Sequence, residues 1–293
     1  MTRSRIRSIL VSCIVIMLIG LIAVSMSSRS IEFEGIPVVF LCAFIAVGIQ
    51  WIVFIPSYIA QTEHYFDLSG TITYLSLTGF IFFTLNKIGS VDTRTLIIGI
   101  LVGVWALRLG TFLFTRVKRD GFDRRFIELK PNFLRFFSVW NLQALWVFLT
   151  FAAGIAAMTS IEKSSIGIIE YFGLGLWIFG FMFEIISDRQ KRKFRENLQN
   201  KDKFISTGLW AWSQHPNYFG EIVLWIGIAI IAAPVLEGWQ LITLISPIFV
   251  FVLLTKISGV RLLDIGAKER WGQNPEYLTY ISKTPVLFPN PFL

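Results

Sequence analysis

The densest group of reactive side chains in this chain is His215-Pro216-Asn217-Tyr218, followed by Glu221. The group stands between a strongly basic segment and an apolar run of membrane length. Proline is favoured in the first turn of a helix, so we expect a helix to start by Pro216 and to present Asn217 and Glu221 on one face. An amide beside a carboxylate can bind an amide, a ribose or an adenine group. In the alternative interpretation, Glu221 is only an acid that the positive end of the helix dipole favours.

A second polar group combines acids and bases at regular spacing. Glu184, Asp188, Arg192 and Arg195 follow one another at intervals of four, four and three residues, which places them on one helix face. The face runs from acids at the membrane end to arginines outside it, and this pattern suits a ligand with both hydrogen-bonding and phosphate parts. The alternative is a set of ordinary ion pairs at the end of a span.

A third group lies in residues 61–70, a segment without basic residues. Glu63, Tyr65 and Asp67 alternate there, and Tyr74 follows in the next apolar run. Tyr, Glu and Asp are side chains that can donate a proton at a buried mouth. We therefore name these four residues as candidate catalytic groups. The alternative is that they cap a helix.

Arg108 lies inside an apolar run, far from the expected ends of that run. A lone cation there costs several kcal/mol unless it is paired or hydrated. We therefore expect Arg108 to line a cavity or a binding site. If the helix extends further than its apolar residues indicate, the long side chain can instead reach the interface.

The elements that must position these groups are membrane helices. Hydrophobic residues make up 54% of the chain, charged residues 16%, and the mean hydropathy is +0.65, which indicates an integral membrane protein. Runs close to the roughly 20 residues that cross a bilayer predict an all-α, polytopic bundle of seven or eight spans. The third and seventh runs are short enough to be tilted or re-entrant. The runs are 6–26, 36–56, 70–85, 95–115, 137–158, 166–186, 219–236 and 239–257.

The basic residues predict the orientation of the bundle. Of 27 Lys and Arg residues, 21 lie before or at the start of the first span, between spans four and five, between spans six and seven, or after the last. With eight spans, these segments and both termini share one side, which the positive-inside rule identifies as cytosolic. The opposite loops carry only Arg29, Lys87, Arg94 and Lys163. Topology and membrane lipids therefore account for the net charge of +8 without a nucleic-acid partner.

Other architectures have little support in the sequence. No repeat, low-complexity tract or long soluble insertion interrupts the chain, so we expect one integral membrane domain over residues 1–293. Cys13 and Cys42 fall within expected spans, and two histidines are too few for a histidine metal cluster, so we expect no metal. Gly173-Leu174-Gly175 lies in mid-span and lacks the third glycine of a dinucleotide fingerprint.

Several motifs resemble a known family. Residues 208–221, which read Gly-Leu-Trp-Ala-Trp-Ser-Gln-His-Pro-Asn-Tyr-Phe-Gly-Glu, are similar to the C-terminal domain of steroid 5α-reductases, as is the upstream Ser187-Asp188. The bacterial branch called the DUF1295 group also resembles residues 62–70 and residues 105–126. The resemblance covers roughly residues 50–290 and leaves the first span and its loop, residues 1–35, outside.

The resemblance implies an oxidoreductase, embedded in a bacterial inner membrane, that uses NADPH to reduce a carbon–carbon double bond conjugated to a carbonyl. The substrate would be lipid-like, such as a steroid or isoprenoid enone, and the cofactor would lie in a cytosol-facing cavity. Guanidinium groups suit the phosphates of NADPH, while carboxylates and amides suit ribose and nicotinamide. The candidate cofactor-binding residues are Arg108, Arg119, Glu184, Asp188, Arg192, Arg195, His215, Asn217, Tyr218 and Glu221.

One position departs from that family. Steroid 5α-reductases use a Tyr and a Glu to polarise the substrate ketone, and the position of that Tyr is Trp105 here. An indole N–H donates a hydrogen bond but does not serve as a proton donor at neutral pH. We expect a group near Glu63 or Tyr65 to stabilise the enolate oxygen instead, and a desolvated carboxyl can stay protonated near neutral pH.

Two other functions fit parts of the sequence. Isoprenylcysteine carboxyl methyltransferases carry a related Arg-His-Pro-x-Tyr motif and bind S-adenosylmethionine. Here Gln214 replaces that arginine, and Asn217 with Glu221 fits the reductase pattern better. Charge inside the membrane would also suit a transporter or a lipid-binding protein, although the repeated halves that transporters often show are not evident.

Overall fold

The computed structural model describes residues 3–121, 123 and 126–292. Over these residues, eight helices are long and apolar enough to cross a membrane, which confirms an all-α polytopic bundle. The third and seventh spans have 22 and 20 residues, because Asp67 and Asn217 belong to the helices and not to the loops before them. That both termini face the cytosol stays a prediction. The spans are Arg5–Ser27, Val38–Ile59, Phe66–Lys87, Thr93–Lys118, Phe133–Thr150, Ile168–Glu196, Pro216–Val235 and Gly238–Trp271.

The chain divides into two compact units. Unit 1 comprises Met1–Gly167 and Ile231–Ser246, and unit 2 comprises Ile168–Ile230 and Pro247–Leu293. That the chain acts as one domain over residues 1–293 stays a prediction. The helices and strands of unit 1 are α1 (Arg3–Ser27), β1 (Glu32–Phe33), β2 (Ile36–Pro37), α2 (Val38–Ile59), α3 (Phe66–Lys87), α4 (Thr93–Asp120), α5 (Phe133–Thr150), α6 (Ala152–Thr159), η3 (Ala233–Val235) and η4 (Gly238–Ile245).

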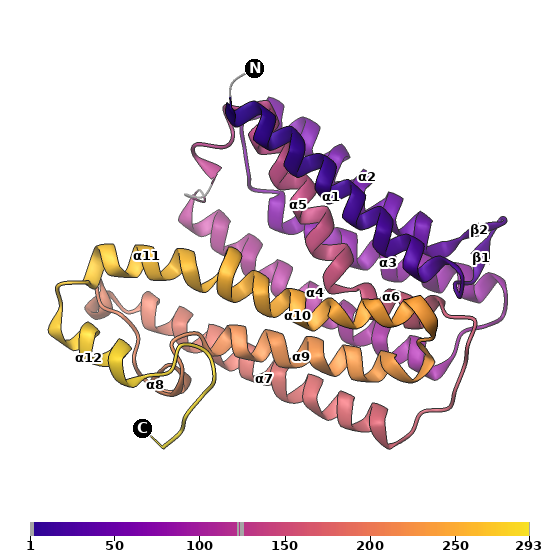
Figure 1. Ribbon diagram of the computed structural model, residues 1–293. Coiled ribbons are helices and arrows are strands. Elements are labelled where there is room, and N and C mark those ends of the chain that lie inside the picture. The colour runs from indigo at the N-terminus through magenta and orange to yellow at the C-terminus, as the bar shows by residue number, and fades with distance from the viewer. Residues whose placement is uncertain (1–2, 122, 124–125, 293) are drawn as a thin grey trace. The chain divides into compact units, whose positions relative to one another are not determined.

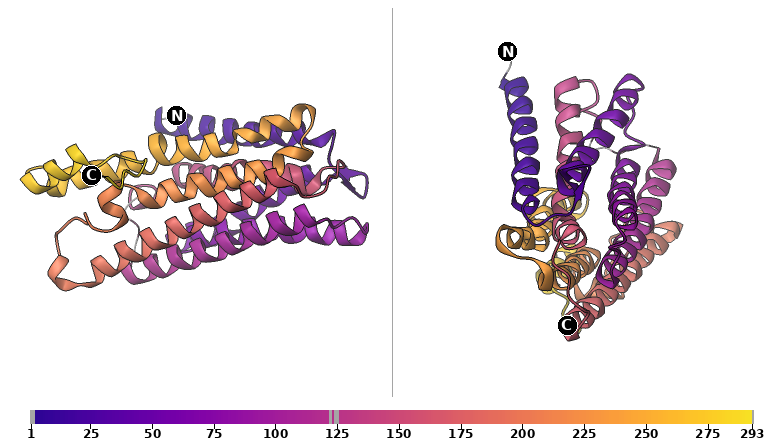
Figure 2. Two further views of the ribbon diagram at one scale, coloured as in Figure 1. Left: turned by 90° about the horizontal axis from the view of Figure 1, so that it is seen from below. Right: turned by 90° about the vertical axis from the view of Figure 1, so that its right-hand side faces the viewer.

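In unit 1, the helices pack in pairs along their length. α1 packs against α2 and α5, α2 packs against α3 and α5, and α3 runs beside α4 (Figures 1 and 2). β1 and β2 form an antiparallel hairpin whose turn residues, Glu34 and Gly35, have φ values of 53° and 78°. A two-residue hairpin loop of this kind requires positive φ at both positions.

One part of the interior of unit 1 is a cluster of aromatic side chains. Phe54, Phe66, Phe126, Phe136 and Trp140 form a buried cluster, with ring centroids 4.9 Å apart for Phe66 and Phe126. Such edge and tilted contacts add to the apolar area that the rings bury.

Buried polar side chains link α2 with α3. Gln50 Nε2 donates to Thr73 Oγ1 at 2.8 Å, and Ser69 Oγ donates to Gln50 Oε1 at 2.9 Å. Hydrogen bonds across helices hold spans together where lipid gives little hydrophobic drive. These contacts fix the register of α3, and α3 carries two of the candidate catalytic residues.

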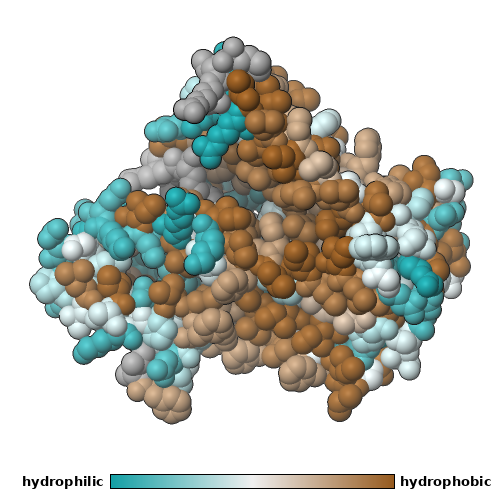
Figure 3. Space-filling view, viewed as in Figure 1, coloured by the Kyte–Doolittle hydropathy of each residue, from teal (hydrophilic) through white to brown (hydrophobic). Residues whose placement is uncertain are grey.

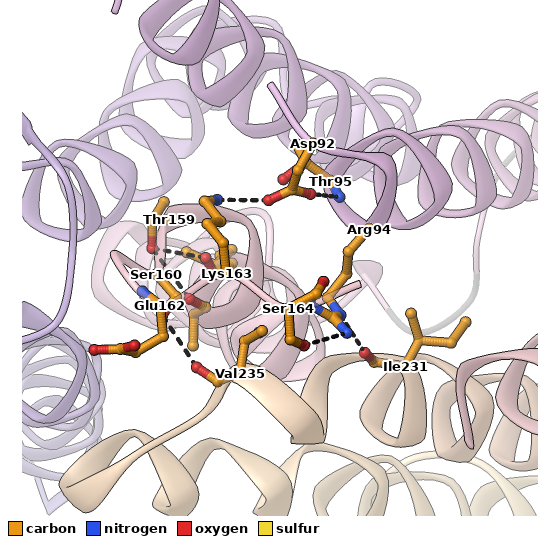
Figure 4. A network of polar contacts seen from close by, with 12 residues as sticks. Asp92, Arg94, Thr95, Thr159, Ser160, Glu162, Lys163, Ser164, Ile231 and Val235 are labelled. Carbon is orange, nitrogen blue, oxygen red and sulfur yellow. Dashed lines mark hydrogen bonds and ion pairs between the residues drawn. The ribbon is translucent and has the colours of Figure 1, made fainter. Parts of the chain in front are cut away.

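Polar contacts gather at the end of unit 1 that carries the loop between α3 and α4 (Figure 4). Arg94 is 2% exposed, and its guanidinium donates to Ile231 O at 3.1 Å and to Ser164 O at 3.1 Å. Lys163 Nζ lies 2.7 Å from the Asp92 carboxylate, which also caps α4 by accepting from Thr95 N. These bonds satisfy buried charge that would otherwise be costly, and they tie three chain segments together.

The remaining basic residues of the loops expected to lie outside the cytosol are also paired. Arg29 contacts Glu162 at 2.9 Å and Glu237 at 3.0 Å, and Lys87 Nζ lies 3.1 Å from Glu34.

Unit 2 is built around two long helices. Its elements are α7 (Ile168–Glu196), η2 (Leu198–Asn200), α8 (Leu209–Trp212), α9 (Pro216–Ala232), α10 (Ser246–Val252), a π-helical turn η5 (Leu253–Ile257), α11 (Val260–Trp271) and α12 (Pro275–Lys283). The terminal residues of α9 and the first of α10 are counted with unit 1. The exposed sides of α9 and α10 are apolar, whereas hydrophilic residues gather around α11 and α12 (Figure 3).

Candidate functional site

Two helices of unit 2 approach each other so closely that only glycine fits between them. A Cβ added at Gly180 of α7 would stand 2.5 Å from Gly220 O and 2.6 Å from Leu224 N of α9. One added at Gly227 of α9 would stand 2.6 Å from Gly173 O of α7. The contact thus moves backward along α7 as it moves forward along α9. The two helices are therefore antiparallel, with glycine on both sides of the seam, as small residues permit in membrane helix pairs.

The seam brings candidate cofactor-binding residues of both helices together. A Cβ added at Gly220 would lie 2.7 Å from Glu184 N, so the backbones that carry Glu184 and Glu221 touch. Because the helices are antiparallel, Asp188, one turn after Glu184 on α7, lies at the level of Asn217, about one turn before Gly220 on α9. Glu184, Asp188 and Glu221 are 2%, 6% and 8% exposed, and Asn217 is half-buried. Buried carboxylates need hydrogen-bond donors, which is what ribose hydroxyls and amide groups supply.

The arginines of α7 lie at the open end of the same helix. α7 continues to Glu196, so Glu184, Asp188, Arg192 and Arg195 belong to one helix, as their spacing predicts. Both arginines are exposed, and Arg192 Nε stands 3.9 Å from Glu196 Oε1. Exposed guanidinium groups one to two turns beyond buried acids give the helix a gradient from negative to positive charge.

His215 stands just before the first residue of α9 and is held on several sides. It is 5% exposed, its ring stacks on Tyr218 with centroids 5.5 Å apart and planes 9° apart, and its Nε2 lies 3.4 Å from Asp264 Oδ1 of α11. Its backbone N–H donates to Ser213 Oγ. Among the described residues, no group makes a hydrogen bond with the buried His215 Nδ1.

The chain after α12 supports the His-Pro-Asn segment. Ser213 Oγ donates to Leu287 O at 2.8 Å, Gln214 N donates to Pro285 O at 2.9 Å, and Asn290 N donates to Trp212 O at 2.9 Å. Sequence reasoning missed both this support and Asp264. No short-range pattern signals either, because the partners lie more than forty residues apart along the chain.

Gly208 starts the approach to α8 with φ 64°. A Cβ there would stand 2.6 Å from Gln190 Nε2, and Gln190 Oε1 accepts from Leu209 N at 3.0 Å. Trp210 Nε1 then donates to Ser187 O at 3.0 Å. These contacts fasten the segment before His215 to α7, next to Asp188.

A second polar site lies within unit 1. A cavity of about 20 Å³, which is room for about one water molecule, is lined by two candidate catalytic residues, Asp67 and Tyr74, and by Trp105. The Tyr74 ring meets the Trp105 ring edge-on at 5.2 Å and the Trp146 ring at 5.5 Å. A phenol and a carboxyl therefore share one small cavity with the tryptophan that replaces the tyrosine of the resembling family. The remaining lining residues are Thr71, Ala106, Leu109, Gly110 and Leu113.

The other two candidate catalytic residues do not line this cavity. Glu63 is buried, its Oε2 lies 2.6 Å from Lys130 Nζ, and its Oε1 accepts from Asp123 N at 2.8 Å. Burial by itself would raise the pKa of Glu63, but the Lys130 and backbone hydrogen bonds outweigh it and lower the pKa. Glu63 is thus a carboxylate in an ion pair, and a catalytic role for it stays a prediction. Tyr65 is 51% exposed.

Two candidate arginines belong to unit 1. Arg108 lies on α4, is half-buried and stands with its guanidinium 5.4 Å from the Phe112 ring centroid. α4 extends to Asp120, beyond the expected end of the span. The side chain of Arg119 lies outside the described residues. A cofactor-binding role for either arginine stays a prediction.

No group of three or more His, Cys, Asp or Glu side chains among the described residues is placed to hold a metal ion. Fold and site together define a polytopic membrane protein with a buried acidic and amide site beside exposed arginines.

The chain belongs to the family described as protein of unknown function (DUF1295), whose model matches residues 53–284. The match includes the α7–α9 seam, the His-Pro-Asn segment and the unit 1 cavity, and it leaves α1 outside.

Curated relatives match the chain at low identity or over a short part of its length. The chain is 24% identical to an uncharacterized protein of Schizosaccharomyces pombe over 67% of this chain and 63% of the relative. It is 36% identical to 3-oxo-5-alpha-steroid 4-dehydrogenase 1 of Bos taurus over 23% of this chain and 26% of that protein, and 32% identical to the Mus musculus protein of the same name over 26% and 28%. The matches thus span less than two thirds of these relatives. No solved structure matches the chain.

Proposed function

We propose that this protein is a membrane-embedded, NADPH-dependent reductase that saturates a carbon–carbon double bond conjugated to a carbonyl in a lipid-like substrate. The observation that carries the proposal is the glycine seam of α7 and α9, which sets Glu184 and Glu221 on touching backbones. Local similarity to steroid dehydrogenases agrees with this reaction class. The site would face the cytosol from a bacterial inner membrane.

The residues of unit 2 fit NADPH in chemical type. The buried carboxylates of Glu184, Asp188 and Glu221 accept hydrogen bonds from ribose hydroxyls, and the Asn217 amide can both donate to and accept from a carboxamide. Arg192 and Arg195 are exposed at the end of α7 and suit phosphate groups.

When bound, NADPH supplies a hydride, which adds two electrons to the β-carbon of the enone and leaves NADP⁺. The electron pair of the double bond then shifts so that the carbonyl oxygen carries negative charge, and the α-carbon must receive a proton. A phenol or carboxyl can stabilise that oxygen, and Tyr74 and Asp67 are the candidates named from the sequence. The Trp105 N–H can add a hydrogen bond but no proton.

The test is turnover in detergent or nanodiscs. Purified protein, given NADPH deuterated at the transferring position and a panel of enone steroids and isoprenoids, should form a saturated ketone with deuterium at the β-carbon. Asn217→Ala and Glu221→Gln should abolish the reaction, whereas Glu276→Gln, an exposed acid on α12, should leave it unchanged. Absence of NADPH consumption across the panel, with no NADPH binding, would refute the proposal.

The same preparation separates the competing functions. Binding and turnover of S-adenosylmethionine in place of NADPH would identify a methyltransferase. A transporter or lipid-binding protein would keep its lipid binding in Asn217→Ala and Glu221→Gln, because neither residue would then serve a cofactor.

A further inference from the structure

The His215 imidazole has one nitrogen paired with a carboxylate and one buried nitrogen to which none of the described residues hydrogen-bonds. Its Nε2 lies 3.4 Å from the Asp264 carboxylate, and its ring is fixed in orientation by stacking on Tyr218. No described residue hydrogen-bonds to Nδ1, although the residue is only 5% exposed. A buried polar atom left in this way costs free energy unless a ligand satisfies it.

The contact with Asp264 decides what kind of ligand group can do so. A carboxylate only accepts hydrogen bonds, so Nε2 must carry the proton. In a neutral imidazole, Nδ1 then presents a lone pair and acts as an acceptor. A carboxylate that orients a histidine through its other nitrogen is a familiar arrangement in metal sites, where it sets the tautomer of the ligating imidazole.

Asp264 lies close enough to Tyr277 of α12 to affect its phenol electrostatically. The pKa of Tyr277 on α12 is raised, first by burial and then by the negative charge of Asp264. Tyr277 also contacts the rings of Phe204 and Trp271, at 5.2 Å and 5.8 Å between centroids. The Asp264 side chain is 38% exposed, so the buried His215 ring meets a partly solvent-accessible carboxylate.

We infer that Asp264 is a positioning residue, which fixes His215 in the Nε2–H tautomer so that Nδ1 accepts a hydrogen bond from a ligand hydroxyl, amine or amide N–H. The inference rests on the proposed function for the identity of the ligand. It assigns a hydroxyl- or amide-bearing part of NADPH to His215, and it places the phosphates elsewhere, because a phosphate oxygen offers no proton to a lone pair.

Imidazole nitrogen NMR on the full-length protein, with isotope-labelled histidine, tests the tautomer directly. The chain has only two histidines, and His64→Gln assigns the signals. His64 is an internal reference, because its Nε2 lies 2.9 Å from the Gly121 carbonyl oxygen, which only accepts. We expect His215 to be protonated at Nε2 alone at neutral pH.

Substitutions on α11 test whether Asp264 sets the tautomer of His215. Asp264→Ala should release a mixture of tautomers at His215 and weaken NADPH binding about tenfold, the effect of losing about one hydrogen bond. Asp264→Glu, which keeps the carboxylate, should restore much of the Nε2–H form. Glu269→Gln, an exposed acid on the same helix, should change neither measurement. Unchanged His64 signals would verify that each variant is folded.

The outcomes separate the two parts of the inference. An Nδ1–H tautomer in the wild-type protein, or an unchanged tautomer in Asp264→Ala, overturns the role of Asp264. Addition of NADPH should shift the His215 Nδ1 signal in the direction expected for a nitrogen that accepts a hydrogen bond. If the tautomer is as expected but NADPH leaves that signal unchanged, the assignment of the ligand is overturned while the positioning role of Asp264 stands.

Discussion

The glycine seam makes a sharp prediction for Gly220→Ala. The new Cβ would stand 2.6 Å from Gly180 O, 2.7 Å from Glu184 N and 3.1 Å from Glu184 Cα. All three atoms belong to the backbone of α7, so no side chain can rotate away to make room. The two helices must separate by roughly 1 Å to reach ordinary contact distances near 3.5–4 Å.

The size of the effect follows from the cost of overpacking. Extra methylenes in a packed interior typically cost about 1–3 kcal/mol, which lowers the folding equilibrium constant by about 5- to 150-fold. A displacement near 1 Å at a ligand site can cost about 100-fold in function. Gly220→Ala should therefore lose most NADPH binding, because it moves Glu221 away from Glu184, even where the protein still folds.

The measurement is unfolding in detergent with increasing denaturant, joined to an NADPH titration. Gly175→Ala is the matched control, because Gly175 lies on α7 and a Cβ there meets nothing within 4 Å. Alanine is the better helix former by about 1 kcal/mol, so the control should be as stable as the wild type or more so. If Gly220→Ala matched Gly175→Ala in both measurements, the close contact of α7 with α9 would be refuted.

Three further substitutions test other parts of the structure. Glu63→Gln should cost about 3–5 kcal/mol at pH 7 by leaving Lys130 unpaired. Because the folded pKa of Glu63 lies below its ordinary 4.5, wild-type stability from this pair should be present above that pH and vanish as the pH falls further, and equal acid sensitivity of both proteins would contradict the pair. Arg94→Met should cost about 2–4 kcal/mol in the same unfolding assay, since one buried and one partly buried carbonyl oxygen lose a charged donor; wild-type stability would show that the network is dispensable. Tyr74→Phe should lower kcat for an enone about 100-fold or more and leave the Kd for NADPH unchanged, whereas an unaltered kcat would transfer the proposed role to Asp67.

The membrane spans could be predicted from the sequence because they depend on local properties. Apolar runs of helical length located all eight helices, and the first-turn preference of Pro216 located the start of α9. The spacing of Glu184 and Asp188 likewise predicted a shared helix, because helical periodicity is fixed by backbone geometry.

The partners of the site residues could not be predicted in this way. Gly180 and Gly220 read as ordinary glycines in apolar runs until the structure brings their helices together. The ion pair of Glu63 with Lys130 and the contact of His215 with Asp264 join residues far apart along the chain, where neither periodicity nor spacing carries information.

A direct titration of the purified protein with NADPH tests the central claim, which is that the buried acids and amide of α7 and α9 hold a phosphorylated dinucleotide. We predict saturable binding of NADPH, much weaker binding in Asn217→Ala, wild-type binding in Glu276→Gln and no binding of S-adenosylmethionine. NADPH binding that is absent, or that persists undiminished in Asn217→Ala, would contradict the account.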